Sequence, residues 1–297
     1  MHPLILSFAN SCSRWAGKMF SANPFAELST TIPAIVMQAY LIFMIILVFA
    51  GTLFDVVHKG SAKYFFANFR KSKDQGTSVA FSTKIAIALH TFASGVLTSS
   101  EFCNQKRRIA HLLGMYGFVL NVVATFMMVM FYATPNIVTP AIWPQLWCIG
   151  ALMVCVGGYW FWFFIRVDVA AEGASPFRVM RADLFILSLL ASNTFALIWG
   201  YTQSISSGWA FVFLAFYLIA TSVLFGSVPW SKFSHMFFKP AAAFEKELSV
   251  ANGSRNNLPK PADRSDPAVR DRHSMDLLKD APLNMGLGIK RESPNHY

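Results

Sequence analysis

Five apolar runs, each long enough to cross a lipid bilayer, dominate this sequence. A transmembrane helix needs about 20 apolar residues, because each residue adds about 1.5 Å of rise and the hydrocarbon core is about 30 Å thick. The composition agrees, since 55% of the residues are hydrophobic and only 13% are charged, against about 25% charged in soluble proteins. We therefore expect an all-α membrane protein with about five transmembrane helices. The predicted spans are approximately Pro33–Val57, Ile109–Tyr132, Gln145–Ile165, Asp183–Gln203 and Trp209–Val228.

A sixth stretch, residues 79–98, is only moderately apolar and carries Lys84 and His90. Basic residues flank it on both sides, and the positive-inside rule places such flanks in the cytoplasm. A crossing would put one basic flank outside, so we expect an interfacial helix that lies on or dips into the cytoplasmic face of the membrane. The flanking cations are Lys59, Lys63, Arg70, Lys71 and Lys73 before the stretch, and Lys106, Arg107 and Arg108 after it.

The loops between the spans predict the orientation. Segments 133–144 and 204–208 carry no charged residue, whereas 166–181 and the segment after Val228 carry several. The N-terminus is then outside and the C-terminus is cytoplasmic. The short apolar stretch at the start of the chain has no preceding positive charge, which argues against a cleaved signal peptide.

Three regions follow from this pattern. Residues 1–32 are expected to be an extracytoplasmic segment, residues 33–240 the transmembrane domain, and residues 241–297 a flexible cytoplasmic tail. The tail opens with AAAFEKEL, which favours a short amphipathic helix that breaks at ANGSRNNLPKP. Beyond that point the mixed charges, Pro and Gly are typical of disorder. The predicted location is the cell inner (cytoplasmic) membrane, as a multi-pass protein surrounded by membrane lipids.

Charge and cysteine spacing disfavour several other functions. The net charge of +10 lies in clusters beside apolar runs, so membrane flanks explain it better than nucleic-acid binding does. The four cysteines, Cys12, Cys103, Cys148 and Cys155, form no CxxC pair and give no signature of an iron–sulfur cluster or zinc site. No phosphate-binding glycine loop, nucleophile triad or dinucleotide fingerprint is present, which disfavours a self-sufficient catalytic subunit.

Two histidines lie where apolar helices meet the basic cytoplasmic side. His111 is about one turn inside the second span, in RRIAHLLGMYGF, and His235 lies just beyond the fifth, in PWSKFSHMFFKP. Heme iron takes two neutral imidazoles on opposite faces, which two helices supply when their histidines match in depth. Gly114 and Gly117 remove side-chain bulk near His111, where a porphyrin would approach. We therefore expect His111 and His235 to be the axial ligands of one heme iron. Each also fits an ordinary interfacial histidine, and His90 is an alternative ligand.

These strings resemble a known family. Basic residues before His111, a Gly-containing apolar helix and the later PWSKFSHMFFKP are similar to cytochrome b subunits of the nitrate reductase gamma type, over residues 33–240. The resemblance implies five helices that hold b hemes between the second and fifth spans, with electrons passing between membrane quinone and a cytoplasmic iron–sulfur subunit. Related subunits serve heterodisulfide-reductase-like and quinone-interacting oxidoreductase complexes. Within the family, the layout is most similar to the membrane anchor of adenylylsulfate reductase in sulfur metabolism.

One departure from the family changes the expected number of hemes. Asn121 and Tyr217 stand ten residues after His111 and eighteen before His235, where two-heme members carry a second pair of histidines. Neither residue suits a low-spin heme, so we expect the outer heme to be absent. The resemblance then implies an anchor and electron-transfer subunit that links a cytoplasmic iron–sulfur flavoprotein oxidoreductase to quinone through one heme b.

Quinone chemistry moves protons with electrons, so it needs a titratable group beside an apolar slot. Asp55 and His58 stand three residues apart on one face at the inner end of the first span, and His90 lies on the interfacial stretch. These three residues are the candidates for a quinone or proton site. An ion pair between Asp55 and Lys59, and headgroup contacts of the two histidines, are the simpler explanations.

Two other functions also fit the sequence. A heme-free structural anchor would use the same helices and leave the histidines as interfacial residues. A small-solute transporter would need polar groups that converge near the middle of the membrane. The spans show few such groups beyond Asn121, Asn193 and Gln203.

Overall fold

The computed structural model describes residues 17–58, 61–100, 102, 104–166, 177, 179–180, 183–230, 235–256 and 258. All regular structure in these residues is helical. The chain divides into two compact units. The first comprises Met1–Ala62 with Gln105–Phe238, and the second comprises Lys63–Asn104 with Lys239–Tyr297.

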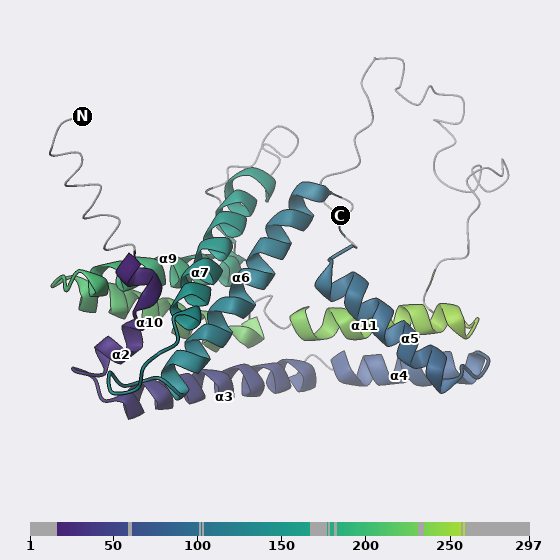
Figure 1. Ribbon diagram of the computed structural model, residues 1–297. Coiled ribbons are helices and arrows are strands. Elements are labelled where there is room, and N and C mark those ends of the chain that lie inside the picture. The colour runs from purple at the N-terminus through teal and green to yellow at the C-terminus, as the bar shows by residue number, and fades with distance from the viewer. Residues whose placement is uncertain are drawn as a thin grey trace, which may run out of the picture. The chain divides into compact units, whose positions relative to one another are not determined.

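The first unit is a bundle of long apolar helices (Figure 1). A short helix α2 precedes it, and η2 continues α7 directly, so that the two form one continuous span. The elements are α2 (Pro24–Leu28), α3 (Ala34–His58), α6 (Gln105–Met130), α7 (Ile142–Trp160), η2 (Phe161–Ile165), α9 (Leu184–Ser204), α10 (Ala210–Gly226) and η4 (Val228–Trp230).

Among the described residues, four helices are long and apolar enough to cross a membrane: α3, α6, α7 with η2, and α9. They mark the chain as a membrane protein and match four of the five predicted spans. The fifth predicted span is the shorter apolar helix α10, whose 17 residues rise about 25 Å. Large apolar side chains on α3 face outward, with Phe49 74% exposed and Val57 71% exposed.

Contacts between helix ends define one end of the first unit. The Arg107 guanidinium on α6 donates to the Ile165 carbonyl at the end of η2 (3.3 Å). Arg166 forms an ion pair with Asp183, the residue before α9. Near the end of α3, a Cβ added at Gly51 would lie 3.1 Å from the Val228 side chain of η4. We call this end the basic end, because Lys106, Arg107, Arg108 and Arg166 lie there.

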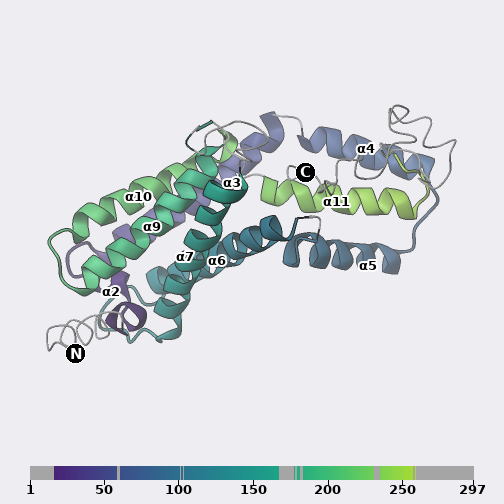
Figure 2. The same cartoon turned by 90° about the horizontal axis from the view of Figure 1, so that it is seen from above.

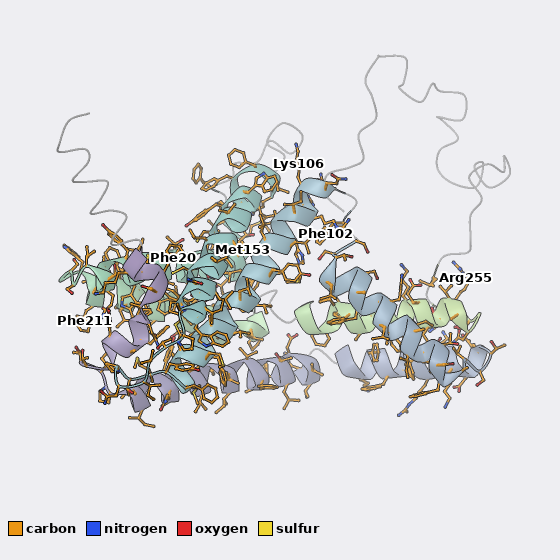
Figure 3. All side chains as sticks on the ribbon, in the orientation of Figure 1. Phe20, Phe102, Lys106, Met153, Phe211 and Arg255 are labelled. Atoms are coloured by element: carbon orange, nitrogen blue, oxygen red, sulfur yellow. The ribbon has the colours of Figure 1, made fainter. Side chains whose placement is uncertain are left out.

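The opposite end is closed by the segment before α3. Asn23 accepts from the first backbone N–H groups of α2, and its amide donates to the Tyr132 carbonyl beyond α6 (2.8 Å). Lys18 donates to the Ser204 carbonyl at the end of α9 (3.1 Å). Figure 3 shows Lys106 and Phe211, the starts of α6 and α10, at opposite ends of the bundle. Helices α6 and α10 therefore start from opposite ends of the bundle.

The ion pair at the basic end gives a stability prediction. Arg166 and Asp183 are only 12% and 15% exposed, and the guanidinium also lies 4.0 Å from the ring centre of Trp162. Asp183→Asn leaves a mostly buried guanidinium with a neutral neighbour, so we expect the free energy of unfolding of the detergent-solubilised protein to fall by about 2 kcal/mol. The matched control is Glu247→Gln, whose partner Lys246 is 62% exposed at 3.9 Å. This control should change stability by less than about 0.5 kcal/mol, and equal effects of the two substitutions would contradict the prediction.

Small residues bring α6 and α7 into backbone contact. A Cβ added at Gly117 would lie 2.6 Å from the Gly150 carbonyl oxygen, and one added at Gly157 would lie 2.7 Å from the Ala110 carbonyl oxygen. Such close approach is typical of membrane helices, which gain van der Waals contact where side chains are small. Gly117 therefore packs against α7 and does not make room for a porphyrin. Gly114 fits the sequence expectation, because a Cβ there would meet no atom within 4 Å.

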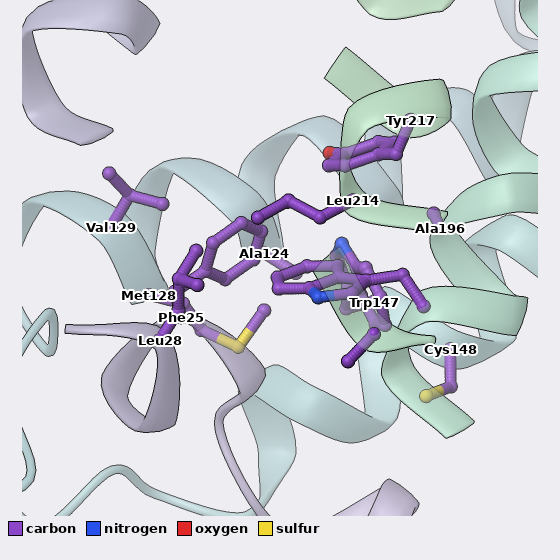
Figure 4. Packing of buried hydrophobic residues seen from close by; sticks show 12 residues of the cluster. Phe25, Leu28, Ala124, Met128, Val129, Trp147, Cys148, Ala196, Leu214 and Tyr217 are labelled. Carbon is purple, nitrogen blue, oxygen red and sulfur yellow. The ribbon is translucent and has the colours of Figure 1, made fainter. Parts of the chain in front are cut away.

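An aromatic cluster fills the bundle toward its opposite end (Figure 4). The Trp199 ring lies 5.1 Å from Phe25 of α2 and 6.1 Å from Trp147 of α7, both edge to face, and it stacks on Tyr217 of α10 at 5.7 Å. These geometries are the favoured ones for aromatic pairs. The described part of the predicted extracytoplasmic segment 1–32 is thus packed into the bundle through Phe25 and Leu28.

The second unit contains α5 (Phe81–Thr91), η1 (Phe92–Leu97) and most of α4 (Ser61–Gln75) and of α11 (His235–Ala251). Helices α4 and α11 run alongside each other in both views (Figures 1 and 2). Asn252, just after α11, donates to the Ser72 carbonyl (3.1 Å) and accepts from the Thr77 backbone N–H (2.8 Å). These hydrogen bonds join the ends of the two helices.

The second unit confirms some of the expectations and adds one helix. Residues 79–98 contain a helical run, Phe81–Leu97. The string AAAFEKEL is part of α11, which ends at Ala251, the first residue of ANGSRNN. Helix α4 was not predicted, because its four cations masked the helical pattern of Phe65, Phe66 and Phe69. The proposed boundary between 240 and 241 falls inside α11. Residues 259–297 lie outside the described residues, so the character of the tail stays a prediction.

Candidate functional site

The first proposed heme ligand, His111, is the seventh residue of α6 and lies near the basic end. Its side chain is exposed on the bundle surface. Helical periodicity places His111 on the same face of α6 as Gly114 and Phe118, which follow it by three and seven residues. Open space at Gly114 therefore lies one turn from the imidazole.

The second proposed ligand, His235, is the first residue of α11. It belongs to the same unit as His111, which extends to Phe238. The His235 side chain lies outside the described part of the structure, so pairing with His111 stays a prediction. Helices α6 and α10 contact each other through Phe118 and Phe225, whose ring centres are 6.4 Å apart.

The proposed quinone or proton residues have different surroundings. Asp55 is 2% exposed in the last turn of α3. His58 is exposed and its ring stacks on Phe54, with centres 5.2 Å apart and planes 8° apart. His90 is exposed on α5, in the second unit. Asp55 and His58 thus lie at the same end of α3, but Asp55 is buried and His58 is exposed. Lys59, the expected partner of Asp55, lies outside the described residues.

A cavity of about 420 Å³ lies within the first unit, between α3 and the helices α6, α9 and α10. We call it the α3 cavity. Most of its lining is apolar, including Met44, Val48 and Phe49 of α3 and Leu214 of α10. Volumes of 300–1,000 Å³ with such a lining are typical of sites for small organic molecules.

Polar side chains gather on one part of the α3 cavity wall. Tyr40 donates to the Leu218 carbonyl (3.1 Å), and the Ser192 and Thr221 hydroxyls form a hydrogen bond (2.8 Å). The polar lining residues are Tyr40, Asn121, Thr125, Ser192, Asn193, Tyr217 and Thr221.

One acceptor in this wall has no partner among the described residues. The Asn193 amide donates to the Leu189 carbonyl of its own helix (2.9 Å), while Oδ1 is buried without a hydrogen bond. By comparison, the Asn121 amide donates across to the Trp147 carbonyl on α7 (3.0 Å). A buried acceptor without a partner costs free energy, and the cost is greater where water is scarce.

Sequence reasoning found the polar residues but not the cavity. The sequence singled out Asn121 with Tyr217 for the absent heme and Asn121 with Asn193 for a transporter, and the structure places all three residues at one cavity. Gln203, the third mid-span amide considered for a transporter, does not line it. Because most of the wall is apolar, the cavity suits a lipid-soluble molecule better than a polar solute. The cavity exists because α3 packs loosely against α6, α9 and α10. No local sequence pattern predicts how closely two helices pack.

The described residues contain no group of three or more His, Cys, Asp or Glu side chains that would hold a metal ion by themselves. Cys148 and Cys155 are free thiols on α7. Cys12 and Cys103 lie outside the described residues. Comparison with models of protein families, with curated proteins and with solved structures finds no match to this chain.

Proposed function

We propose that this chain is the membrane anchor and electron-transfer subunit of an oxidoreductase complex in the cytoplasmic membrane. In this proposal it carries one heme b through His111 and His235 and connects a cytoplasmic iron–sulfur flavoprotein, adenylylsulfate reductase, to the quinone pool. The sulfur chemistry belongs to the partner. The chain itself anchors the complex and transfers electrons, and it is not the catalytic subunit.

The observation that carries the proposal is the open space beside His111 at the basic end. Among the described residues, no atom lies within 4 Å of a Cβ added at Gly114, one turn away, whereas a Cβ added at Gly117 would meet α7. No described side chain therefore fills the face of α6 beside Gly114, where we place the porphyrin. Helix α6 runs away from the basic end and α10 runs toward it. His111 precedes the Phe118–Phe225 contact and His235 follows it along the chain. This order supports placing both histidines on the basic side of that contact.

The residues around this region have distinct roles in the proposal. A bound b heme would supply one-electron redox chemistry. His111 and His235 would hold its iron as neutral imidazoles, and Arg107 and Arg108 lie close by along α6, where they offer positive charge to acidic groups on the heme edge. Buried Asp55 at the end of α3 would accept a proton.

Membrane insertion in this proposal uses five spans, with α10 as the fifth. Helix α10 has 17 residues, and η4 follows it and extends its apolar length. A span that is still shorter than the bilayer is accommodated by local thinning of the bilayer, at a modest cost in free energy. The basic end then faces the cytoplasm, in line with the positive-inside rule. Helices α4 and α5 lie at the cytoplasmic interface, where their cations meet lipid headgroups.

The anchoring role predicts where the partner enzyme is found in the cell. In cells that contain the chain, adenylylsulfate reductase activity should sediment with the membranes after a low-salt wash. In cells that lack the gene, the activity should move to the soluble fraction, because nothing else in the proposal holds the enzyme at the bilayer. Complementation with the wild-type gene is the control. Activity that stays soluble in both strains, or stays bound without the chain, would reject this partner.

A further inference from the structure

We propose that the α3 cavity binds the ring of a lipid hydroquinone, with a ring hydroxyl donating to Asn193 Oδ1. This assignment rests on the proposed exchange of electrons with quinone, and it places the bound ring in a cavity that none of the earlier candidates Asp55, His58 and His90 lines. The proposal concerns binding of the reduced form.

The depth of the polar wall limits what the occupant is. Asn193 is the tenth of 21 residues of α9, and Tyr217 is the eighth of 17 residues of α10, so both lie near the middle of their helices. A charged headgroup is costly at that depth. A neutral ring with hydroxyl groups is not, provided that its hydroxyls are hydrogen-bonded.

The cavity opens toward the lipid side. Its lining includes Val36 and Phe49 of α3, which are 53% and 74% exposed, and Phe126 of α6, which is 37% exposed. An entrance bordered by exposed apolar side chains on membrane-spanning helices admits molecules that are dissolved in the bilayer. A long apolar tail can leave by the same opening and lie along α3.

The hydrogen-bonding groups favour the hydroquinone over the quinone. Asn193 Oδ1 only accepts hydrogen bonds, is buried, and has no partner among the described residues. A hydroquinone donates an O–H to such an acceptor, whereas a quinone has only carbonyl acceptors. Tyr217 also lines the cavity, where its ring stacks on Trp199 at 5.7 Å and its hydroxyl hydrogen-bonds to Thr125 and Thr221.

The test measures the binding of a decyl-substituted benzohydroquinone and of its quinone to the purified, delipidated full chain, by quenching of tryptophan fluorescence under argon. We expect wild type to bind the hydroquinone about tenfold more tightly than the quinone. Asn193→Leu should remove this preference, and Tyr217→Phe should weaken both probes. The matched control is Thr202→Val, because the Thr202 hydroxyl bonds only to carbonyls of its own helix, outside the cavity.

Three results would overturn the assignment. One is equal binding of the two redox forms by wild type, and another is a preference that persists in Asn193→Leu. The third is displacement of the hydroquinone by dodecanol at similar concentration, which would identify the ligand as any lipid hydroxyl. The binding measurement does not depend on heme. If the purified chain lacks heme but still prefers the hydroquinone, the proposed electron transfer is rejected, whereas the hydroquinone site in the α3 cavity is retained.

Discussion

Gly117→Ala is expected to destabilise the protein severely, although alanine is the better helix former. The added Cβ would lie 2.6 Å from the Gly150 carbonyl oxygen, 2.7 Å from the Met153 Cβ and 2.9 Å from the Val154 backbone nitrogen. Two of these atoms belong to the backbone of α7 and cannot turn away, so α6 and α7 must separate. Overpacking and the loss of close helix contact together cost about 3 kcal/mol, which should appear as a lower midpoint of thermal unfolding in detergent.

Gly114→Ala is the matched control for this prediction. Gly114 lies on the same helix, three residues earlier, and its Cβ would meet no atom within 4 Å. In the heme-free protein, where no porphyrin lies against this face, the usual gain of up to about 1 kcal/mol for alanine over glycine in a helix should then be visible. If the two substitutions shift stability in the same direction by similar amounts, the close backbone packing of α6 on α7 is wrong.

Removing either proposed heme ligand should abolish heme binding. A low-spin b heme needs both axial imidazoles. His111→Ala and His235→Ala are each expected to lose the sharp alpha band of the dithionite-reduced protein. His111 is exposed at the surface of α6, so its loss should leave the packing of the bundle intact.

His58→Ala and His90→Ala are the controls for the ligand assignment. Neither His58, which stacks on Phe54 at the end of α3, nor His90 on α5 is a ligand in the proposal, so both variants should keep the full band. Loss of the band in His90→Ala, with the band retained in one of the other two variants, would move a ligand to the interfacial helix. Full heme content in His111→Ala would reject this histidine as a ligand.

The spans were predictable because long apolar runs have few alternatives to crossing the membrane. The first predicted range, Pro33–Val57, differs by one residue at each end from α3, and Asp183–Gln203 differs likewise from α9. The start of α6 was predicted four residues late, because Gln105 to Arg108 are polar although helical. Hydropathy thus located the membrane core of each helix and not its polar extension.

The packing was less accessible from the sequence. Gly117 and Gly114 look alike in the string HLLGMYGF, and only the position of α7 separates a packing glycine from an open one. In the same way, nothing local predicted that Phe25 packs against both Trp147 and Trp199. Contacts between residues far apart in the chain depend on which helices are neighbours, and a single sequence does not encode that in any short pattern.

The heme content of the purified chain tests the central claim most directly. A reduced-minus-oxidised spectrum of the wild-type protein, with heme quantified by extraction against protein concentration, should give one b heme per chain. One heme agrees with a histidine pair at the basic end and with Asn121 and Tyr217 lining the α3 cavity in place of an outer pair. A chain that is fully folded and carries no heme, or that carries two, would contradict the account.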